Sequence, residues 1–449
     1  MEVAKFGGSS LSNSEQIKKV GKIISLNDKI KCVIVSAPGK RFETDTKVTD
    51  LLIALHTNKI YNLNVEDILD KIIARYRDII IELKLSSHLP EKFRETLLEL
   101  INTIEDQDLL LDALKSSGER FNAKMIAEYL VSLGINARYM SPKHAGIFLT
   151  NTPGKGTLLD KSYKEIEAML DVDGILVIPG FYGYSKEGNI ITFKRGGSDI
   201  TGAIVSRGIH ADTYLNYTDQ SYIFRADPRI VENPEAIDEL TYLEMRTLSY
   251  SGFGIFHEEA LEPLYHHSIP VVIKNTNNPA FGGTKIVQSR SVKPKELITG
   301  FASRKGFINI SINKYMMDSD IGYLRKLLRI FEDFGVYIDH SPTSVDNISL
   351  FINKNNFNSL DDLDHIMRDI KEVLEPDNIS IKENIAVINA AGEGMQNTIG
   401  SVKRLTSALT DAEINIIMTM SGAHESSIIF AVHERDEALA IKSLYKAFF

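Results

Sequence analysis

The stretch Lys194–Ala203 carries the residue types best suited to binding an anion. It reads Lys-Arg-Gly-Gly-Ser-Asp-Ile-Thr-Gly-Ala and follows the alternating apolar segment Asn189–Phe193. A strand that ends at paired glycines and runs into a helix points backbone N–H groups at a phosphate or carboxylate. Arg195 adds a bidentate fork for such a group, and Asp199 can orient a nucleophile or a metal-bound phosphate. A glycine turn with a surface ion pair is the alternative that this stretch leaves open.

A second glycine turn follows the predicted N-terminal strand Glu2–Phe6. Lys5 lies beside Gly7 and Gly8, whose backbone can approach a phosphate closely. The chain has neither the Gly-x4-Gly-Lys-[Ser/Thr] order of a Walker loop nor the Gly-x-Gly-x-x-Gly order of a dinucleotide fold. By itself, a segment of this kind is more often a plain turn between a strand and a helix.

Ser116 and Glu119 allow a structural and a functional explanation. Their spacing is that of a capping box, which predicts that a helix begins there and continues through Leu133. A carboxylate at the mouth of the same cleft could instead hold a substrate ammonium. The spacing does not choose between the two.

Short apolar segments alternate with helix-like stretches over the first two thirds of the chain. The segments expected to be strands are Glu2–Phe6, Cys32–Ser36, Ala137–Ser141, Gly174–Ile178, Asp212–Asn216 and Ile269–Lys274. The alternation predicts a parallel, doubly wound α/β sheet whose site lies at the carboxyl ends of the strands. Cys32 falls inside a continuous apolar segment, so we expect a buried structural thiol there.

Composition limits the classes of partner. A chain of 449 residues predicts roughly two to three domains. A net charge of -9 gives no electrostatic footprint for nucleic acid or an anionic membrane. No apolar run approaches the roughly 18 residues of a membrane span, and the eleven histidines lack ligand spacing. We therefore expect a cytoplasmic protein without a metal site of its own, a membrane segment or a nucleic-acid partner.

Beyond residue 295 the pattern repeats. Gly322 and Gly400 each open a helix-like stretch, and Val336–Asp339 matches Ile414–Ile417 at the same offset of 78 residues (400 − 322 and 414 − 336). The simplest explanation is an internal duplication of a small βαββαβ module.

Taken together and in this order, the motifs resemble those of the aspartokinases, amino-acid kinases with C-terminal tandem ACT domains. The matching segments are Lys5–Ser10, Ser36 with Val48–Leu52, Ser117–Glu119, Arg195–Asp199, Thr218–Asp219 with Ala226–Arg229, Phe281–Thr284, Gly392–Met395 and Leu444–Phe449. The resemblance implies an α/β parallel-sheet sandwich of the amino-acid-kinase type at 1–293, then two α+β (ferredoxin-like) ACT regulatory domains at 294–380 and 381–449. It implies ATP-dependent phosphorylation of the β-carboxylate of L-aspartate, which opens lysine, threonine and methionine synthesis.

The resemblance also implies roles for individual residues. Lys5 and Asp199 would be catalytic. The aspartate-binding residues would be Ser36, Thr49, Glu119, Arg195 and Ser198. The ATP-binding residues would be Lys5, Phe6, Gly7, Gly8, Thr218, Asp219, Phe224 and Arg229. The effector residues would be Met317, Gly322, Tyr323, Leu324, Ile338, Asp339, Thr343 and Ser344. Mg²⁺ would be held mainly by the nucleotide phosphates, lysine would be the effector, and ACT domains would assemble a homodimer or a larger homo-oligomer.

One motif departs from the family pattern. The family commonly reads Phe-Gly-Ala-Lys-Val-Leu-His-Pro where this chain reads Ser251–Glu258, so Gly254 replaces a lysine that would face nucleotide phosphates. Phe224 likewise stands where a tyrosine is frequent. These changes leave two alternatives open: a catalytically weak amino-acid sensor on the same fold, and a kinase for another small acidic substrate.

Overall fold

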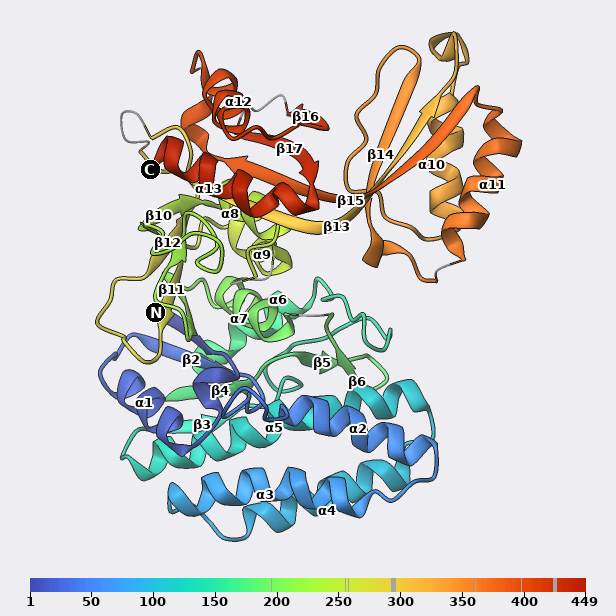
Figure 1. Cartoon of the computed structure of the whole chain (residues 1–449). Coiled ribbons are helices and arrows are strands. Elements are labelled where there is room, and N and C mark those ends of the chain that lie inside the picture. Colours follow the sequence, from blue (N-terminus) through green and yellow to red (C-terminus); the bar gives the residue numbers. More distant parts are fainter. Residues whose placement is uncertain are drawn as a thin grey trace. The chain divides into compact units, whose positions relative to one another are not determined.

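The computed structural model describes residues 1–194, 196–254, 256, 258–291, 296–359, 361–396, 398–422 and 426–449 (Figure 1). The chain divides into two compact units. The first comprises Met1–Ile223, Ala236–Arg246 and Gly254–Arg290. The second comprises Phe224–Glu235, Thr247–Phe253 and Ser291–Phe449.

The first unit is built on an eight-stranded sheet in the order β10-β12-β11-β7-β1-β2-β4-β3. Its strands are β1 (Glu2–Phe6), β2 (Ile30–Val35), β3 (Ala137–Tyr139), β4 (Ile175–Pro179), β7 (Thr213–Thr218), β10 (Glu239–Thr241), β11 (Val271–Asn275) and β12 (Thr284–Val287). Neighbours are parallel except β11 and β12. The six expected strands are all present, so the predicted parallel α/β sheet is confirmed. A hairpin, β5 (Tyr182–Tyr184) with β6 (Ile190–Thr192), lies outside this sheet.

Helices alternate with these strands along the chain. They are α1 (Ser14–Ser25), α2 (Val48–Ile60), α3 (Glu66–Glu82), α4 (Leu89–Thr103), α5 (Gln107–Ser132), α6 (Ser162–Glu167), α7 (Gly197–Gly208), α8 (Tyr242–Tyr250) and α9 (Glu262–Tyr265), with short 3-10 turns at Ser9–Leu11, Ala168–Asp171 and Glu258–Ala260. The two remaining short strands are β8 (Ile223–Phe224) and β9 (Ala236–Ile237).

The capping-box prediction at Ser116 is wrong. Helix α5 begins nine residues earlier, where the Asp106 carboxylate accepts a hydrogen bond from the Leu109 N–H and caps the helix. Ser116 therefore lies in the helix interior, and its hydroxyl donates to the Ala113 carbonyl instead. Glu119 is left free of any capping role.

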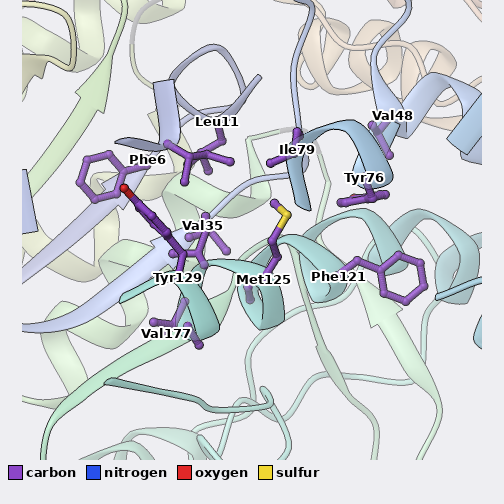
Figure 2. Packing of buried hydrophobic residues seen from close by; sticks show 14 of the residues in the cluster. Phe6, Leu11, Val35, Val48, Tyr76, Ile79, Phe121, Met125, Tyr129 and Val177 are labelled. Carbon is purple, nitrogen blue, oxygen red and sulfur yellow. The ribbon is translucent and has the colours of Figure 1, made fainter. Parts of the chain in front are cut away.

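A single apolar core joins the sheet to the α3–α5 layer. Figure 2 shows Tyr76 and Phe121 beside Met125, with Val35 and Val177 of the neighbouring strands in the same cluster. Cys32 is fully buried, and burial raises the pKa of its thiol to about 12, which confirms a structural cysteine.

The second unit holds a five-stranded antiparallel sheet in the order β14-β13-β15-β17-β16. Its strands are β13 (Gly300–Asn313), β14 (Asn347–Asn353), β15 (Asn378–Ala391), β16 (Met418–Ser421) and β17 (Ser427–His433). Its helices are α10 (Tyr323–Asp333), α11 (Asp362–Leu374), α12 (Ser401–Asp411) and α13 (Glu437–Phe448), with 3-10 turns at Met317–Ser319, Lys354–Asn356, Glu393–Met395 and Glu434–Asp436.

The internal duplication is visible in this unit. Helices α10 and α12 have the same length and begin after Gly322 and Gly400, 78 residues apart. Both glycines adopt a left-handed backbone, with φ of 88° and 93°, which other residues rarely tolerate. The two copies thus begin their first helix in the same way.

The two copies are interleaved rather than consecutive. Strands β13 and β15 run through both (Figure 1), so that residues 307–313 of β13 pair with β14 while residues 300–304 pair only with β15. Phe301 accordingly packs in one core with α12 and α13, and Ile308 packs in the other with α10 and α11. Each core therefore takes residues from both long strands, β13 and β15.

No helix within the part of the chain that the structure describes is long and apolar enough to cross a membrane.

Candidate functional site

The predicted catalytic pair lies at the carboxyl end of the central strands. Lys5 of β1 and Asp199 of α7 form an ion pair with 2.6 Å between Nζ and Oδ1. Asn216 of β7 is the in-register neighbour of Lys5 in the parallel sheet. Its amide nitrogen donates to Asp199 Oδ1 at 2.8 Å, and its amide oxygen accepts from Lys5 Nζ at 3.4 Å. The three side chains form a closed, nearly buried triangle.

Helix α7 supplies the carboxylate of this triangle. The helix begins at Gly197 after Gly196, which adopts a left-handed backbone with φ of 75°. Asp199 lies in the first turn, where the helix dipole stabilises negative charge. The same turn therefore brings free backbone N–H groups and an oriented carboxylate to one place. Ser198 is buried in this turn against Gly180.

Two loops meet at the glycine turn that follows β1. The Gly39 N–H donates to the Gly8 carbonyl at 2.8 Å, and a Cβ on Gly39 would lie 2.6 Å from the Gly8 carbonyl carbon. Glycine is therefore required for the close approach of these backbones. Gly7 lies against Lys5, since a Cβ on Gly7 would come within 3.6 Å of the lysine Nζ.

A buried arginine from α3 holds the same loops together. The Arg75 guanidinium donates to the carbonyls of Ser12 at 3.3 Å and Gly39 at 2.8 Å. It also pairs with Asp45, whose carboxylate accepts three further hydrogen bonds from Arg41. These Arg41 bonds, together with the nearby Arg75 charge, hold the pKa of Asp45 well below its usual range. The segment from Gly39 to Asp45 is thus fixed by charge-assisted hydrogen bonds.

Glu119 is a buried carboxyl group with one oxygen in use. Its Oε1 accepts from the Ala37 N–H at 3.0 Å, whereas Oε2 is buried and has no hydrogen-bond partner within the described chain. Burial raises the pKa of Glu119 to about 8, against the lowering effects of the Ala37 N–H and of Lys115. A buried, unpaired acceptor of this kind is suited to a cationic ligand group.

The remaining predicted substrate residues of the first unit differ in their burial and contacts. Ser36 is half-buried, and its carbonyl accepts from the Asn122 amide at 2.7 Å. Thr49 is half-buried in the first turn of α2. Phe6 is buried and stacks on Tyr217 with ring centroids 4.7 Å apart, so its side chain belongs to the core. Arg195 lies outside the described residues.

The predicted nucleotide residues are divided between the two units. Thr218 ends β7, and its hydroxyl donates to Asp219 at 3.1 Å. Phe224 and Arg229 belong to the second unit, where Arg229 is exposed and pairs with Asp227 at 2.6 Å. Arg225, a neighbouring cation of the same unit, pairs with Glu296 at 3.0 Å.

The predicted effector residues lie around the start of α10 and the segment before β14. Met317 and Tyr323 are buried, whereas Leu324, Thr343 and Ser344 are exposed. Gly322 caps α10, and Ile338 is half-buried.

Asp339 has an enclosed side chain, which is 1% exposed. Its carboxylate accepts from the Asn353 N–H at 2.9 Å, the Asn356 amide at 2.8 Å and the Tyr250 hydroxyl at 3.1 Å. Arg304 approaches it at 3.6 Å. The carboxylate of Asp339 is therefore held by several partners in the folded chain.

Sequence reasoning missed Asn216 and Arg75. Asn216 ends the predicted strand Asp212–Asn216, and a polar residue at the carboxyl end of a buried parallel strand was the available signal. Arg75 lies in a charged helical stretch, and no local pattern distinguishes it from its exposed neighbours. The part of the chain that the structure describes contains no cluster of three His, Cys, Asp or Glu side chains placed to hold a metal ion.

The arrangement suits transfer of an anionic group to a small zwitterionic acceptor. The Lys5 ammonium lies against the glycine turn and pairs with the first turn of α7, so it can offset charge on a phosphoryl group. The free oxygen of Glu119 can accept a substrate ammonium. No strong base is required if the acceptor is itself a carboxylate, because that nucleophile is already ionised.

Two family models match the sequence. A model of the amino acid kinase family matches residues 1–275. A model of the ACT domain matches residues 388–448. The first covers most of the parallel-sheet unit, and the second lies in the core that contains α12 and α13.

Similar proteins include aspartokinases along their whole length. Aspartokinase 3 of Bacillus subtilis is 41% identical over 450 residues, covering 100% of this chain and 99% of that protein. The crystal structure of Clostridium acetobutylicum aspartate kinase has a TM-score of 0.89 and 38% identity, with 100% of both chains covered. Escherichia coli aspartokinase III shares the fold at 22% identity, with TM-scores of 0.81 in complex with aspartate and ADP and 0.76 in complex with lysine and aspartate.

Proposed function

The chain belongs to the aspartokinases and phosphorylates the β-carboxylate of L-aspartate with ATP, and we propose which of its residues carry that reaction. The observation that supports the proposal is the buried triangle of Lys5, Asn216 and Asp199 beside the Gly7–Gly8 turn. The reaction would supply the synthesis of lysine, threonine and methionine.

Lys5 and Asp199 act at the transferred phosphoryl group. The lysine ammonium offsets negative charge that spreads over the phosphoryl oxygens, and it is already held in place before the substrates arrive. Asp199 fixes the position of that ammonium. Gly7 and Gly8 offer backbone N–H groups to the phosphates, and Thr218, Asp219, Phe224 and Arg229 are proposed as further nucleotide contacts.

Glu119 and Arg195 recognise the two ends of aspartate that do not react. The free Oε2 of Glu119 accepts hydrogen bonds from the α-ammonium. The planar fork of Arg195 binds the α-carboxylate, so Arg195→Lys raises the KM for aspartate and leaves the KM for ATP nearly unchanged. Ser36, Thr49 and Ser198 complete this subsite.

Mg²⁺ enters with ATP, because phosphate oxygens are among the hard ligands that this ion prefers. The described chain can add one ligand of the same kind. Oxygen Oδ1 of Asp199 accepts hydrogen bonds from both Lys5 and Asn216, whereas Oδ2 has no hydrogen-bond or ion-pair partner among the described residues. Bound Mg²⁺ would neutralise charge on the phosphates.

The second unit senses lysine and pairs with a copy of itself. Support for pairing comes from apolar side chains on the solvent face of α10, where Leu324 is 39% and Leu328 is 41% exposed, next to Ile321 at 95%. Two such faces would bury one another. The N-terminus of helix α10 is proposed to bind the effector carboxylate. Asp339 is proposed to bind the effector ammonium, which would replace one of the groups that now contact this carboxylate.

The test is release of ADP in a coupled assay with L-aspartate, L-glutamate or no acceptor. The proposal predicts turnover with aspartate and much slower turnover with glutamate, whose extra methylene misplaces the reacting carboxylate. A second arm captures the acyl phosphate as a hydroxamate. Equal ADP release with and without aspartate would overturn the proposed assignment of the acceptor site.

A further inference from the structure

A buried amide connects the two charged side chains of the site. Asn216 is 2% exposed and lies on β7, the strand next to β1. In-register residues of parallel neighbours point to the same face of the sheet. Lys5 and Asn216 are such a pair, so the topology itself places the amide beside the lysine.

The two ends of the amide are matched to the two charges. The NH₂ group donates to Asp199 Oδ1 at 2.8 Å, and the carbonyl oxygen accepts from Lys5 Nζ at 3.4 Å. A carboxylate in place of the amide could not donate to Asp199, and an apolar side chain could bind neither group. Asparagine is thus the residue of this size that satisfies both.

We propose that Asn216 is a positioning residue for phosphoryl transfer: it holds Lys5 and Asp199 in the arrangement that directs the lysine ammonium at the transferred group. An ammonium has three protons. One is used by Asp199 and one by Asn216, which leaves the third to point beyond the triangle, toward the Gly7 turn. This inference rests on the proposed roles of Lys5 and Asp199.

Without the amide, the ion pair loses its orientation. Lys5 and Asp199 would still attract one another, but the ammonium could rotate about that single contact and spend part of its time turned away from the phosphates. Preorganised charge stabilises a transition state because it needs no reorientation during the reaction. Loss of Asn216 should therefore slow the chemical step and leave substrate binding largely intact.

The test compares Asn216→Leu and Asn216→Asp with Lys5→Ala, measuring kcat and both KM values together with thermal unfolding. Leucine keeps the volume and removes both hydrogen bonds, whereas aspartate keeps the shape and removes the donor. We expect each Asn216 variant to lose about tenfold or more in kcat, with both KM values within about threefold of the parent. If the leucine variant fails to fold, the aspartate variant carries the test.

Tyr214→Phe is the matched control. Tyr214 lies two residues earlier on the same face of β7, and its hydroxyl donates to the Asp199 backbone carbonyl at 3.3 Å rather than to the Asp199 carboxylate. It should keep the parental kcat. A fall in Tyr214→Phe as large as in the Asn216 variants would overturn the inference, because disturbed packing of α7 would then explain both.

Two further outcomes separate this inference from the proposal beneath it. Parental kcat in both Asn216 variants beside an inactive Lys5→Ala, or a raised KM for aspartate at unchanged kcat, would overturn the role of Asn216 alone. Parental kcat in Lys5→Ala would overturn the catalytic assignment on which the role of Asn216 rests.

Discussion

Glu119 is a carboxyl group that keeps its proton near neutral pH. Its pKa in the folded chain is about 8, above the ordinary value of 4.5, because burial disfavours the charged form. Between these two values the unfolded chain has released a proton that the folded chain still holds. The contribution of Glu119 to the free energy of unfolding is therefore full below about pH 4.5 and is lost as the pH rises through 8.

This proton predicts a linkage between aspartate binding and pH. A substrate ammonium at Oε2 favours the ionised carboxylate, so binding of aspartate at pH 7 should release a proton from Glu119. Calorimetric titration in buffers of different ionisation enthalpy measures the number released, and we expect a value approaching one. In Glu119→Gln the buffer dependence should vanish. Identical enthalpies for the parent protein in all buffers would contradict the assignment.

Gly254 departs from the family pattern, and nothing in its surroundings requires glycine at this position. A Cβ at this position would meet nothing within 4 Å, and the backbone is not left-handed. We predict that Gly254→Lys changes the free energy of unfolding by no more than about 0.5 kcal/mol, as for surface substitutions, and lowers the KM for ATP or leaves it unchanged. Urea unfolding and ATP kinetics check this, and a large loss of stability would show a need for glycine.

At the scale of elements, the loops of the site depend on one side chain from a helix outside it. Arg75 reaches from α3 to the carbonyls of Ser12 and Gly39 and to the Asp45 carboxylate. The Arg75 side chain is 5% exposed and that of Asp45 is 9% exposed, so little water can take the place of the guanidinium. The helical layer thereby fixes the backbone beside the Gly7–Gly8 turn.

Arg75→Met should destabilise the protein strongly. The substitution preserves much of the volume, but it removes one of the two arginines that pair with Asp45 and takes the Arg75 donor from the buried carbonyls of Ser12 and Gly39. Each buried acceptor left without a donor costs about 1–3 kcal/mol. Arg94→Met on α4 is the control, because Arg94 is 32% exposed and its ion pairs with Glu66 and Asp70 lie at the surface. Surface pairs contribute about 0–1 kcal/mol. Urea denaturation of both variants gives the comparison, and equal losses would exclude a special role for Arg75.

The sequence predicts the central strands well, because a strand buried on both faces is a continuous apolar run that glycine or polar residues end. Glu2–Phe6 has the same bounds in the structure as in the prediction. The predicted start of α5 at Ser116 is wrong because the Ser-x-x-Glu pattern there lies inside a longer helix that Asp106 caps. Arg75 could not be predicted, since its partners lie 29 to 63 residues away and only tertiary packing brings them together.

At the scale of the whole molecule, the interleaved copies of the second unit suggest where regulation begins. Tyr250 and Arg304 meet at Asp339, and all three residues belong to the second unit. A lysine effector can shift the enzyme only if it binds the inactive arrangement better than the active one. If the effector ammonium replaced one of the groups that now contact Asp339, the two arrangements would differ in their affinity for lysine.

Asp339→Asn should raise the lysine concentration needed for half inhibition by at least about tenfold, since an amide does not replace a buried carboxylate as partner of an ammonium. Turnover without lysine should stay close to the parental value. Asp333→Asn, which alters an exposed carboxylate at the end of α10, serves as the control. Full lysine sensitivity in Asp339→Asn would refute the placement of the effector. Indifference of the parent to every amino acid of the pathway would refute the regulatory proposal.

Lys5 and Glu119 are assigned separate roles: Lys5 stabilises the transferred phosphoryl group, and Glu119 binds the α-ammonium of aspartate. Steady-state kinetics of Lys5→Ala and Glu119→Gln, measured against both substrates, tests this division directly. We predict that Lys5→Ala loses about a hundredfold or more in kcat with little change in the KM for aspartate. Glu119→Gln should instead raise that KM by about tenfold or more. Near-normal kcat in Lys5→Ala, or a parental KM for aspartate in Glu119→Gln, would contradict the account.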